Sequence, residues 1–105
     1  MKSARSKATD ISQTVKKVVE NRDGGRCIIC GKPGKGNSHF IRRSQGGLGI
    51  EENVVTMCFH CHHIYDNGFG LNRQLITELT EEYLRDIYPN CNKEDLVYKK
   101  YQELR

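Results

Sequence analysis

Apolar residues recur at helical spacing near the start of the chain. The four positions that share one helical face are Ile11, Val15, Val18 and Val19. Their spacing of i, i+4, i+7 and i+8 predicts a helix with Asp10 as its N-cap, and the polar and glycine-rich residues 21–25 end it. Residues 1–8 are polar and basic, so we expect a flexible basic arm over residues 1–10.

The pattern changes over residues 26–68, where glycine and asparagine interrupt the apolar runs. Such punctuation predicts a loop-rich segment with short strands, which we place at residues 37–42 and at Val54 and Val55. A helical turn is expected from Phe59 onward.

Helical spacing returns beyond residue 70 in two segments. Thr80 is expected to open the first, whose apolar residues are Tyr83, Leu84 and Ile87. Asn92 is expected to open the second, whose apolar residues are Leu96, Val97, Tyr98 and Tyr101. We therefore expect a domain over residues 11–70 and a helical extension over residues 71–105 that packs on it.

The chain has 105 residues, of which 36% are hydrophobic, and its mean hydropathy is −0.70, so its apolar core is thin. A domain this small usually needs a metal, a disulfide or a partner to hold it together. No segment approaches the ~18 apolar residues of a membrane span, and no apolar signal core follows the basic arm. We therefore expect no membrane association and a cytoplasmic location, where paired cysteines bind metal more often than they form disulfides.

Two Cys-x2-Cys pairs stand out among the five cysteines, and they consist of Cys27 with Cys30 and of Cys58 with Cys61. Each pair places two thiolates about one tetrahedral edge apart, so two such pairs predict a closed four-cysteine structural zinc site. A redox motif and free core thiols are the alternatives, but the chain lacks the βαβ pattern of redox proteins. Cys91 stands alone and is expected to be a buried or half-buried thiol.

Histidines lie between and after the cysteine pairs. His39 sits in an expected strand beside apolar residues, where a lone histidine would more often be a core residue than a catalyst. The zinc, however, ties the segment after His39 to the segment that contains His62, so these imidazoles can converge. Such a pair suits metal-assisted phosphodiester hydrolysis, in which one neutral imidazole takes a proton from water.

The order of these residues resembles the zinc-bearing branch of the HNH homing-type endonucleases over residues 22–68. The match comprises the first cysteine pair, His39 within SHFIRRSQGG, Asn53 within ENVV, and His62 directly after the second pair. The resemblance implies an α+β fold with a small zinc-stabilised ββα-metal core, to which an N-terminal helix and C-terminal helices are added.

The resemblance also implies a role for each member of the triplet. His39 would be the general base at the end of the first strand. Asn53 would pin the loop between the strands through its side-chain amide, and His62 would bind a catalytic divalent cation such as Mg²⁺, Mn²⁺ or Ni²⁺. Asp66 lies one helical turn after His62 and is a further candidate ligand.

Ser38 stands where many relatives carry an Asp or His ligand directly before the base. A serine hydroxyl is a weak neutral ligand, so the cation has to rely on His62, on Asp66 or His63, and on water and phosphate oxygens. Adjacent residues cannot share one helix face, so at most one of His62 and His63 is expected to be a ligand, and we favour His62. His60 is interpreted as structural or solvent-exposed.

Basic residues predict contacts to DNA, in keeping with a net charge of +4. Arg42 and Arg43 follow the expected base directly, and their guanidinium groups match phosphate oxygens, although two solvated arginines are the alternative. Further residues that could extend this footprint are Lys16, Lys17, Arg22 and Arg26. The chain shows no recognition helix, so specificity must come from DNA shape, from the C-terminal helices or from a partner.

The leading prediction is an enzyme, a metal-dependent endonuclease that nicks or cuts DNA and leaves 5′-phosphate and 3′-hydroxyl ends, as the resemblance implies. One alternative is a non-catalytic zinc module that docks DNA or a protein with an impaired HNH site. Another is a structural adaptor that oligomerises through its C-terminal helical faces. The resemblance to small phage-type nucleases implies a bacterial or phage-infected cell and leaves a homodimer or a phage or recombination protein partner open.

Overall fold

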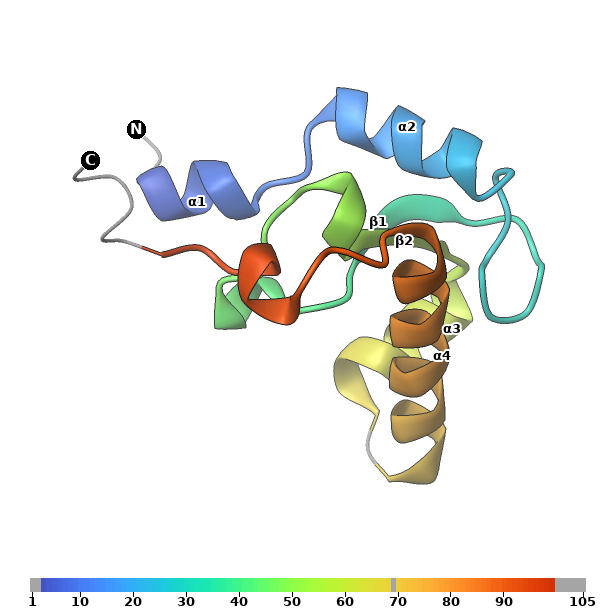
Figure 1. Ribbon diagram of the computed structural model, residues 1–105. Coiled ribbons are helices and arrows are strands. Elements are labelled where there is room, and N and C mark those ends of the chain that lie inside the picture. The colour runs from blue at the N-terminus through green and yellow to red at the C-terminus, as the bar shows by residue number, and fades with distance from the viewer. Residues whose placement is uncertain (1–2, 69, 100–105) are drawn as a thin grey trace.

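The computed structural model describes residues 3–68 and 70–99 and has an α+β architecture (Figure 1). Its helices are α1 (Ala4–Thr9), α2 (Gln13–Arg22), α3 (Phe59–Asn67) and α4 (Leu71–Ile87). Its strands are β1 (Lys35–His39) and β2 (Val54–Met57), and short 3-10 turns span Arg43–Gln45, Glu51–Asn53 and Lys93–Leu96. The predicted fold class, a ββα core with added helices, is therefore confirmed.

The two strands form an antiparallel hairpin in which His39 pairs with Val54 and Ser38 pairs with Val55. Strand β1 alternates, with Gly36 and Ser38 buried, whereas all four residues of β2 are buried. Helix α2 packs on the hairpin, while α3 packs on β2 and α4 on α3 (Figure 1). The short β2 is thus enclosed, which explains why three of its four residues are apolar.

Strand β1 begins and ends earlier than the predicted range of residues 37–42. Beyond His39, the side chain of Asn53, rather than a facing strand, satisfies the backbone groups of Ile41. The Asn53 carboxamide accepts a hydrogen bond from Ile41 N at 2.8 Å and donates one to Ile41 O at 3.2 Å. The chain can therefore turn away from the sheet directly after His39.

The segment before α2 differs from the predicted flexible arm, because residues 4–9 form helix α1. Ser3 caps this helix by accepting a hydrogen bond from Ser6 N, and tertiary contacts hold it in place. Gly49 N donates to Ala8 O at 3.0 Å, and Arg5 donates to Ser44 O at 3.0 Å. A helix this short has little stability by itself, and these tertiary contacts stabilise it. The local sequence cannot predict such contacts.

The predicted cap of α2 was wrong by two residues. Ser12 caps the helix instead of Asp10, since its hydroxyl accepts a hydrogen bond from Val15 N at 3.1 Å. Ile11 consequently lies outside the helix, although its position continues the apolar spacing. Serine and aspartate are about equally good N-caps, so residue type could not distinguish them, and the apolar spacing wrongly indicated Asp10.

The C-terminal extension contains a longer helix than predicted, because α4 begins at Leu71 rather than at Thr80. The Thr80 side chain is buried, and its hydroxyl donates to Ile76 O at 2.7 Å within the helix instead of capping an end. Asn92 does open a turn through a capping box with Asp95, but only residues 93–96 are helical. Tyr101 lies outside the described residues, and the division at residues 70 and 71 stays a prediction.

A buried ion pair joins α2 to the rest of the fold. Arg22 Nε contacts Asp23 Oδ1 at 2.7 Å, and Asp23 has a fully buried side chain that also accepts from Thr56 N and from the Tyr83 hydroxyl. Burial by itself raises the pKa of Asp23, but the hydrogen bonds from Arg22 and Tyr83 lower the pKa overall. Arg22 further donates to Val54 O at 2.8 Å.

The prediction that Arg22 extends the DNA footprint is therefore wrong. Its side chain is 13% exposed and its donors are used inside the protein. A run of charges along a helix does not reveal which side chains turn inward.

The described helices include none that is both long and apolar enough to cross a bilayer.

Candidate metal centre and active site

Two backbone turns bring the four paired cysteines together. In the first turn, Gly31 N donates to Cys27 O at 3.0 Å, and Gly31 adopts a φ of 80°, which glycine tolerates best. In the second, Cys58 caps α3, and its sulfur accepts a hydrogen bond from Cys61 N at 3.4 Å. The hairpin places these turns side by side, so the two cysteine pairs lie close together although they are far apart in the chain.

The resulting cluster fits a structural zinc ion. Its ligand atoms, the Sγ atoms of Cys27, Cys30, Cys58 and Cys61, all lie within 4.8 Å of one another. A Zn–S distance near ~2.3 Å implies sulfur–sulfur separations of about 3.8 Å in a tetrahedron, so small adjustments complete the site. With zinc bound, thiolates would fill all four coordination positions, which would leave none for substrate. Cys91 is half-buried and is not part of the cluster, as predicted.

His39, the last residue of β1, is oriented by α1. Its Nε2 atom lies 2.8 Å from the backbone carbonyl oxygen of Thr9. A carbonyl only accepts hydrogen bonds, so Nε2 carries the proton and Nδ1 is left as the basic nitrogen. Burial lowers the pKa of His39, with the charge of Arg43 acting in the same direction, so the ring is neutral at physiological pH.

An open cavity of about 290 Å³ brings the predicted site residues together. Its lining comprises His39, Arg42, Arg43, Ser44, His62 and Asp66. On α3, His62 Nε2 lies 2.8 Å from Asp66 Oδ2, because residues i and i+4 share a helix face. A neutral imidazole therefore shares one cavity with an imidazole and carboxylate pair of the kind that binds divalent cations.

Asn53 is fully buried behind this cavity. Its carboxamide forms both hydrogen bonds to Ile41 and donates a third, to Leu48 O at 2.9 Å. The backbone of Asn53 adds a bond from Phe40 N to its carbonyl oxygen at 2.7 Å. One side chain thus satisfies backbone groups on both sides of the loop that follows His39.

The remaining candidates lie away from the cavity. Ser38 is fully buried, and its hydroxyl donates to Met57 Sδ at 3.3 Å instead of facing the cavity. His63 is exposed and contacts Asn67, and the cavity lining includes neither it nor the exposed His60. Of His60, His62 and His63, only His62 therefore lines the same cavity as His39.

The two arginines of the cavity have different environments. Arg42 donates to the carbonyl oxygens of Tyr65 at 3.0 Å and Asp66 at 3.2 Å, so it ties the loop after β1 to the end of α3. Arg43 has a side chain that is 54% exposed and forms an ion pair with Asp10. Only Arg43 therefore presents a large part of its guanidinium to solvent.

Sequence reasoning missed Thr9 and the aromatic support of the site. Thr9 was placed in the predicted arm, yet it is buried and supplies the carbonyl for His39. Tyr65 is also buried, and its hydroxyl donates to Phe40 O directly after His39. The position of Tyr65 on the face of α3 next to Cys61 was the one available signal.

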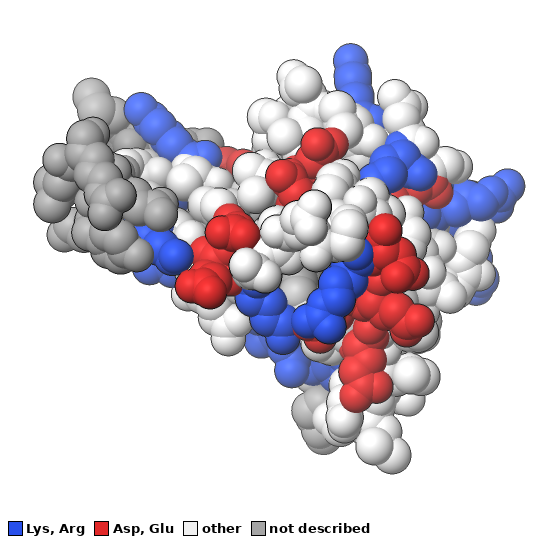
Figure 2. Space-filling model, in the orientation of Figure 1, with Lys and Arg blue, Asp and Glu red and all other residues white. Residues whose placement is uncertain are grey.

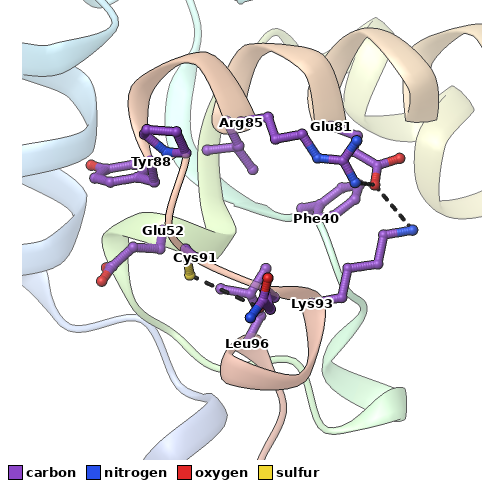
Figure 3. Close-up of a pocket in the computed structure, with 11 residues that line it drawn as sticks. Phe40, Glu52, Glu81, Arg85, Tyr88, Cys91, Lys93 and Leu96 are labelled. Carbon is purple, nitrogen blue, oxygen red and sulfur yellow. Dashed lines mark hydrogen bonds and ion pairs between the residues drawn. The ribbon is translucent and has the colours of Figure 1, made fainter.

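Another cavity lies away from these histidines. A smaller cavity of about 120 Å³ lies between α4 and the turn at Lys93–Leu96, where Cys91 and Glu52 border it (Figure 3). An ion pair between Lys93 and Glu81 closes one side of it (Figure 3). Figure 2 shows acidic side chains gathered over α4, so this face offers DNA no continuous basic surface.

Fold and site together define the class of protein, a ββα-metal finger with a four-cysteine cluster beside a histidine-containing cavity. The sequence profile of the HNH endonuclease family matches residues 27–68. Anaredoxin from Nostoc sp. (strain PCC 7120) is 35% identical over 54 residues, which cover 50% of this chain and 71% of that protein. No solved structure matches the chain. The chain belongs to the HNH endonuclease family.

Proposed function

We propose that this protein is a metal-dependent endonuclease that hydrolyses phosphodiester bonds in DNA. The observation that carries the proposal is one cavity shared by neutral His39 and by the His62–Asp66 pair. His39 is the general base, and His62 and Asp66 hold the divalent cation. Membership of the HNH family supports the choice of DNA as substrate.

The chemistry follows from the tautomer of His39. Nδ1 accepts a proton from a water molecule while Nε2 keeps its bond to Thr9 O. The water oxygen forms a bond to phosphorus as the bond from phosphorus to the 3′ oxygen breaks, which leaves a 5′-phosphate and a 3′-hydroxyl. A divalent cation, when bound, stabilises negative charge on the phosphate and on the leaving oxygen. Asn53 holds the loop that keeps His39 in line.

The phosphate contact is assigned to Arg43 rather than to Arg42. Arg43 is more than half exposed and can exchange its ion pair with Asp10 for a phosphate oxygen. Arg42 instead positions the end of α3, and thereby Asp66, through its bonds to backbone carbonyls. The homodimer and the phage or recombination partner stay predictions.

The cavity offers a cation fewer ligands than the cysteine cluster does. Within residues 3–68 and 70–99, the four cysteines are the only group of three or more His, Cys, Asp or Glu ligands close enough to hold one ion. The cavity therefore offers the cation two protein ligands, because Ser38 is turned into the core. Mg²⁺ commonly keeps several waters and binds through one or two carboxylates plus substrate phosphates, so two ligands still suit a nuclease.

A nicking assay on supercoiled plasmid with Mg²⁺, Mn²⁺ or Ni²⁺ tests the proposal. The wild type is expected to nick the plasmid, and His39→Ala is expected to lose at least about 100-fold in rate with its zinc content unchanged. His60→Ala is the matched control, because His60 is exposed and lies outside the cavity. Undiminished cutting by His39→Ala would remove it from the role of base, and an inactive wild type that binds DNA would favour the docking module.

A further inference from the structure

Phe59 is the most exposed large hydrophobic residue described, with 89% of its surface accessible. It is the first residue of α3, three positions before His62. Apolar surface in water is unfavourable, and a fully solvated phenylalanine contributes nothing to the core. An aromatic ring in this position therefore indicates a binding role rather than a role in the core.

The ring is held in a defined orientation although it is exposed. Phe59 stacks with His63, with ring centroids 6.2 Å apart and an interplanar angle of 15°. His63 Nδ1 in turn lies 3.3 Å from the Asn67 side-chain amide. The three residues follow one another at i, i+4 and i+8 on one face of α3, so the helix itself aligns a two-ring plate.

Phe59 borders a cavity that adjoins the candidate active site. This cavity, of about 420 Å³, is lined by Phe59, Met57, His62, Lys35 and Asn37 with the turn at Pro33 and Gly34. His62 belongs to both cavities, so the two are neighbours. Lys35 and Asn37 lie on the exposed face of β1 and supply a cation and an amide to the lining of the same cavity.

We propose that this second cavity is a nucleobase subsite, in which a base next to the scissile phosphate leaves its stack and packs on Phe59. The inference rests on the proposed function, because the phosphate at His62 sets the position of the neighbouring nucleotide. A base has an aromatic face for Phe59 and polar edges for Asn37, while Lys35 suits the backbone phosphate.

This subsite selects a class of substrate. A base that packs on Phe59 must be unstacked, and unstacking is least unfavourable in single-stranded, mismatched or damaged DNA. Stacking tolerates every base, because each has a π-face. The protein therefore prefers locally unpaired DNA without strong sequence preference.

Binding measurements on the full chain, zinc-loaded and without added divalent cation, test the subsite. Two labelled strands of equal length and charge are compared by fluorescence anisotropy, one of oligothymidylate and one of base-free deoxyribose phosphate. Phe59→Ala is expected to weaken oligothymidylate binding about tenfold and to leave binding of the base-free strand unchanged. Phe59→Trp is expected to bind oligothymidylate at least as well as the wild type.

Leu71→Ala is the matched control, because Leu71 is 82% exposed and lies outside this cavity. Three results would overturn the proposal: an unchanged affinity in Phe59→Ala, an equal loss on the base-free strand, or full retention in Phe59→Leu, which keeps apolar area without an aromatic plane. No cleavage enters this experiment. A failure of His39 as base therefore leaves it interpretable, and a failure of the subsite leaves the nuclease proposal standing.

Discussion

The imidazole of His39 is oriented by the backbone carbonyl of Thr9, a residue 30 positions earlier, over a distance of 2.8 Å. This contact assigns the proton to Nε2 and leaves Nδ1 to accept one. Helix α1 thereby belongs to the candidate active site, although local sequence marks it as a polar tail. The position and the basicity of His39 both depend on this contact.

Cleavage is expected to persist at mildly acidic pH. A general base works in its neutral form, and burial lowers the pKa of His39 below its usual value of about 6.5. The charges of Arg43 and His62 lower this pKa further, whereas the Thr9 carbonyl and Asp66 oppose the shift. The acidic limb of the single-turnover rate at saturating metal should therefore be centred below pH 6.5. An acidic limb centred above pH 7 would contradict the assignment.

Gly49→Ala is expected to slow cleavage without unfolding the protein. A Cβ atom at residue 49 would lie 2.0 Å from Asp10 O, so the segment that carries Thr9 must move. Misplacing a catalytic group by about 1 Å can lower the rate on the order of 100-fold. The rate is measured by plasmid nicking, and zinc content serves as the control for the metal centre. A variant with normal activity would show that the Thr9 contact is dispensable.

Loss of zinc is expected to unfold the domain. Structural zinc contributes roughly 10–16 kcal/mol in small zinc-binding domains, whereas whole domains are stable by only about 5–15 kcal/mol. Circular dichroism after strong chelation, or of Cys58→Ser, should show loss of helical signal. Cys91→Ser is the matched control, because Cys91 lies outside the cluster. An apo protein with unchanged thermal unfolding would refute the structural role.

Arg22→Met is expected to destabilise the fold by roughly 3–5 kcal/mol, because it leaves the buried Asp23 carboxylate without its partner. Urea unfolding measures this loss. Lys17→Met, on the exposed part of α2, is expected to leave stability within about 0.5 kcal/mol of the wild type and to weaken DNA binding slightly. Equal effects of the two substitutions on stability would contradict the buried ion pair.

The local sequence pattern correctly predicted the features near the cysteine cluster. The two cysteine pairs predicted the cluster. The spacing of His62 and Asp66 predicted that both share one helix face, and His62 Nε2 lies 2.8 Å from Asp66 Oδ2. These relations follow from short-range geometry, since a Cys-x2-Cys turn and an i, i+4 pair need no knowledge of distant contacts. The capping box at Asn92 is of the same kind.

Long-range contacts decided the rest. Thr80 resembles a cap in sequence, yet packing buries it inside α4. Arg22 resembles a surface cation, yet Asp23, Val54 of β2 and Tyr88, directly after α4, supply it with acceptors. Residue type sets which bonds a side chain can form, but only the folded chain sets which partners come within reach.

The sequence by itself determined the two cysteine pairs, because a Cys-x2-Cys turn needs only short spacing. The α+β class and the roles of His39, Asn53 and His62 were implied by the resemblance to the HNH family. Only the tertiary structure decided that a carbonyl of α1 orients His39 and that Ser38 faces the core. It also decided that Phe59 stays in solvent beside His62. Such relations join residues far apart in the chain, and they exist only once packing has fixed the relative positions of the elements.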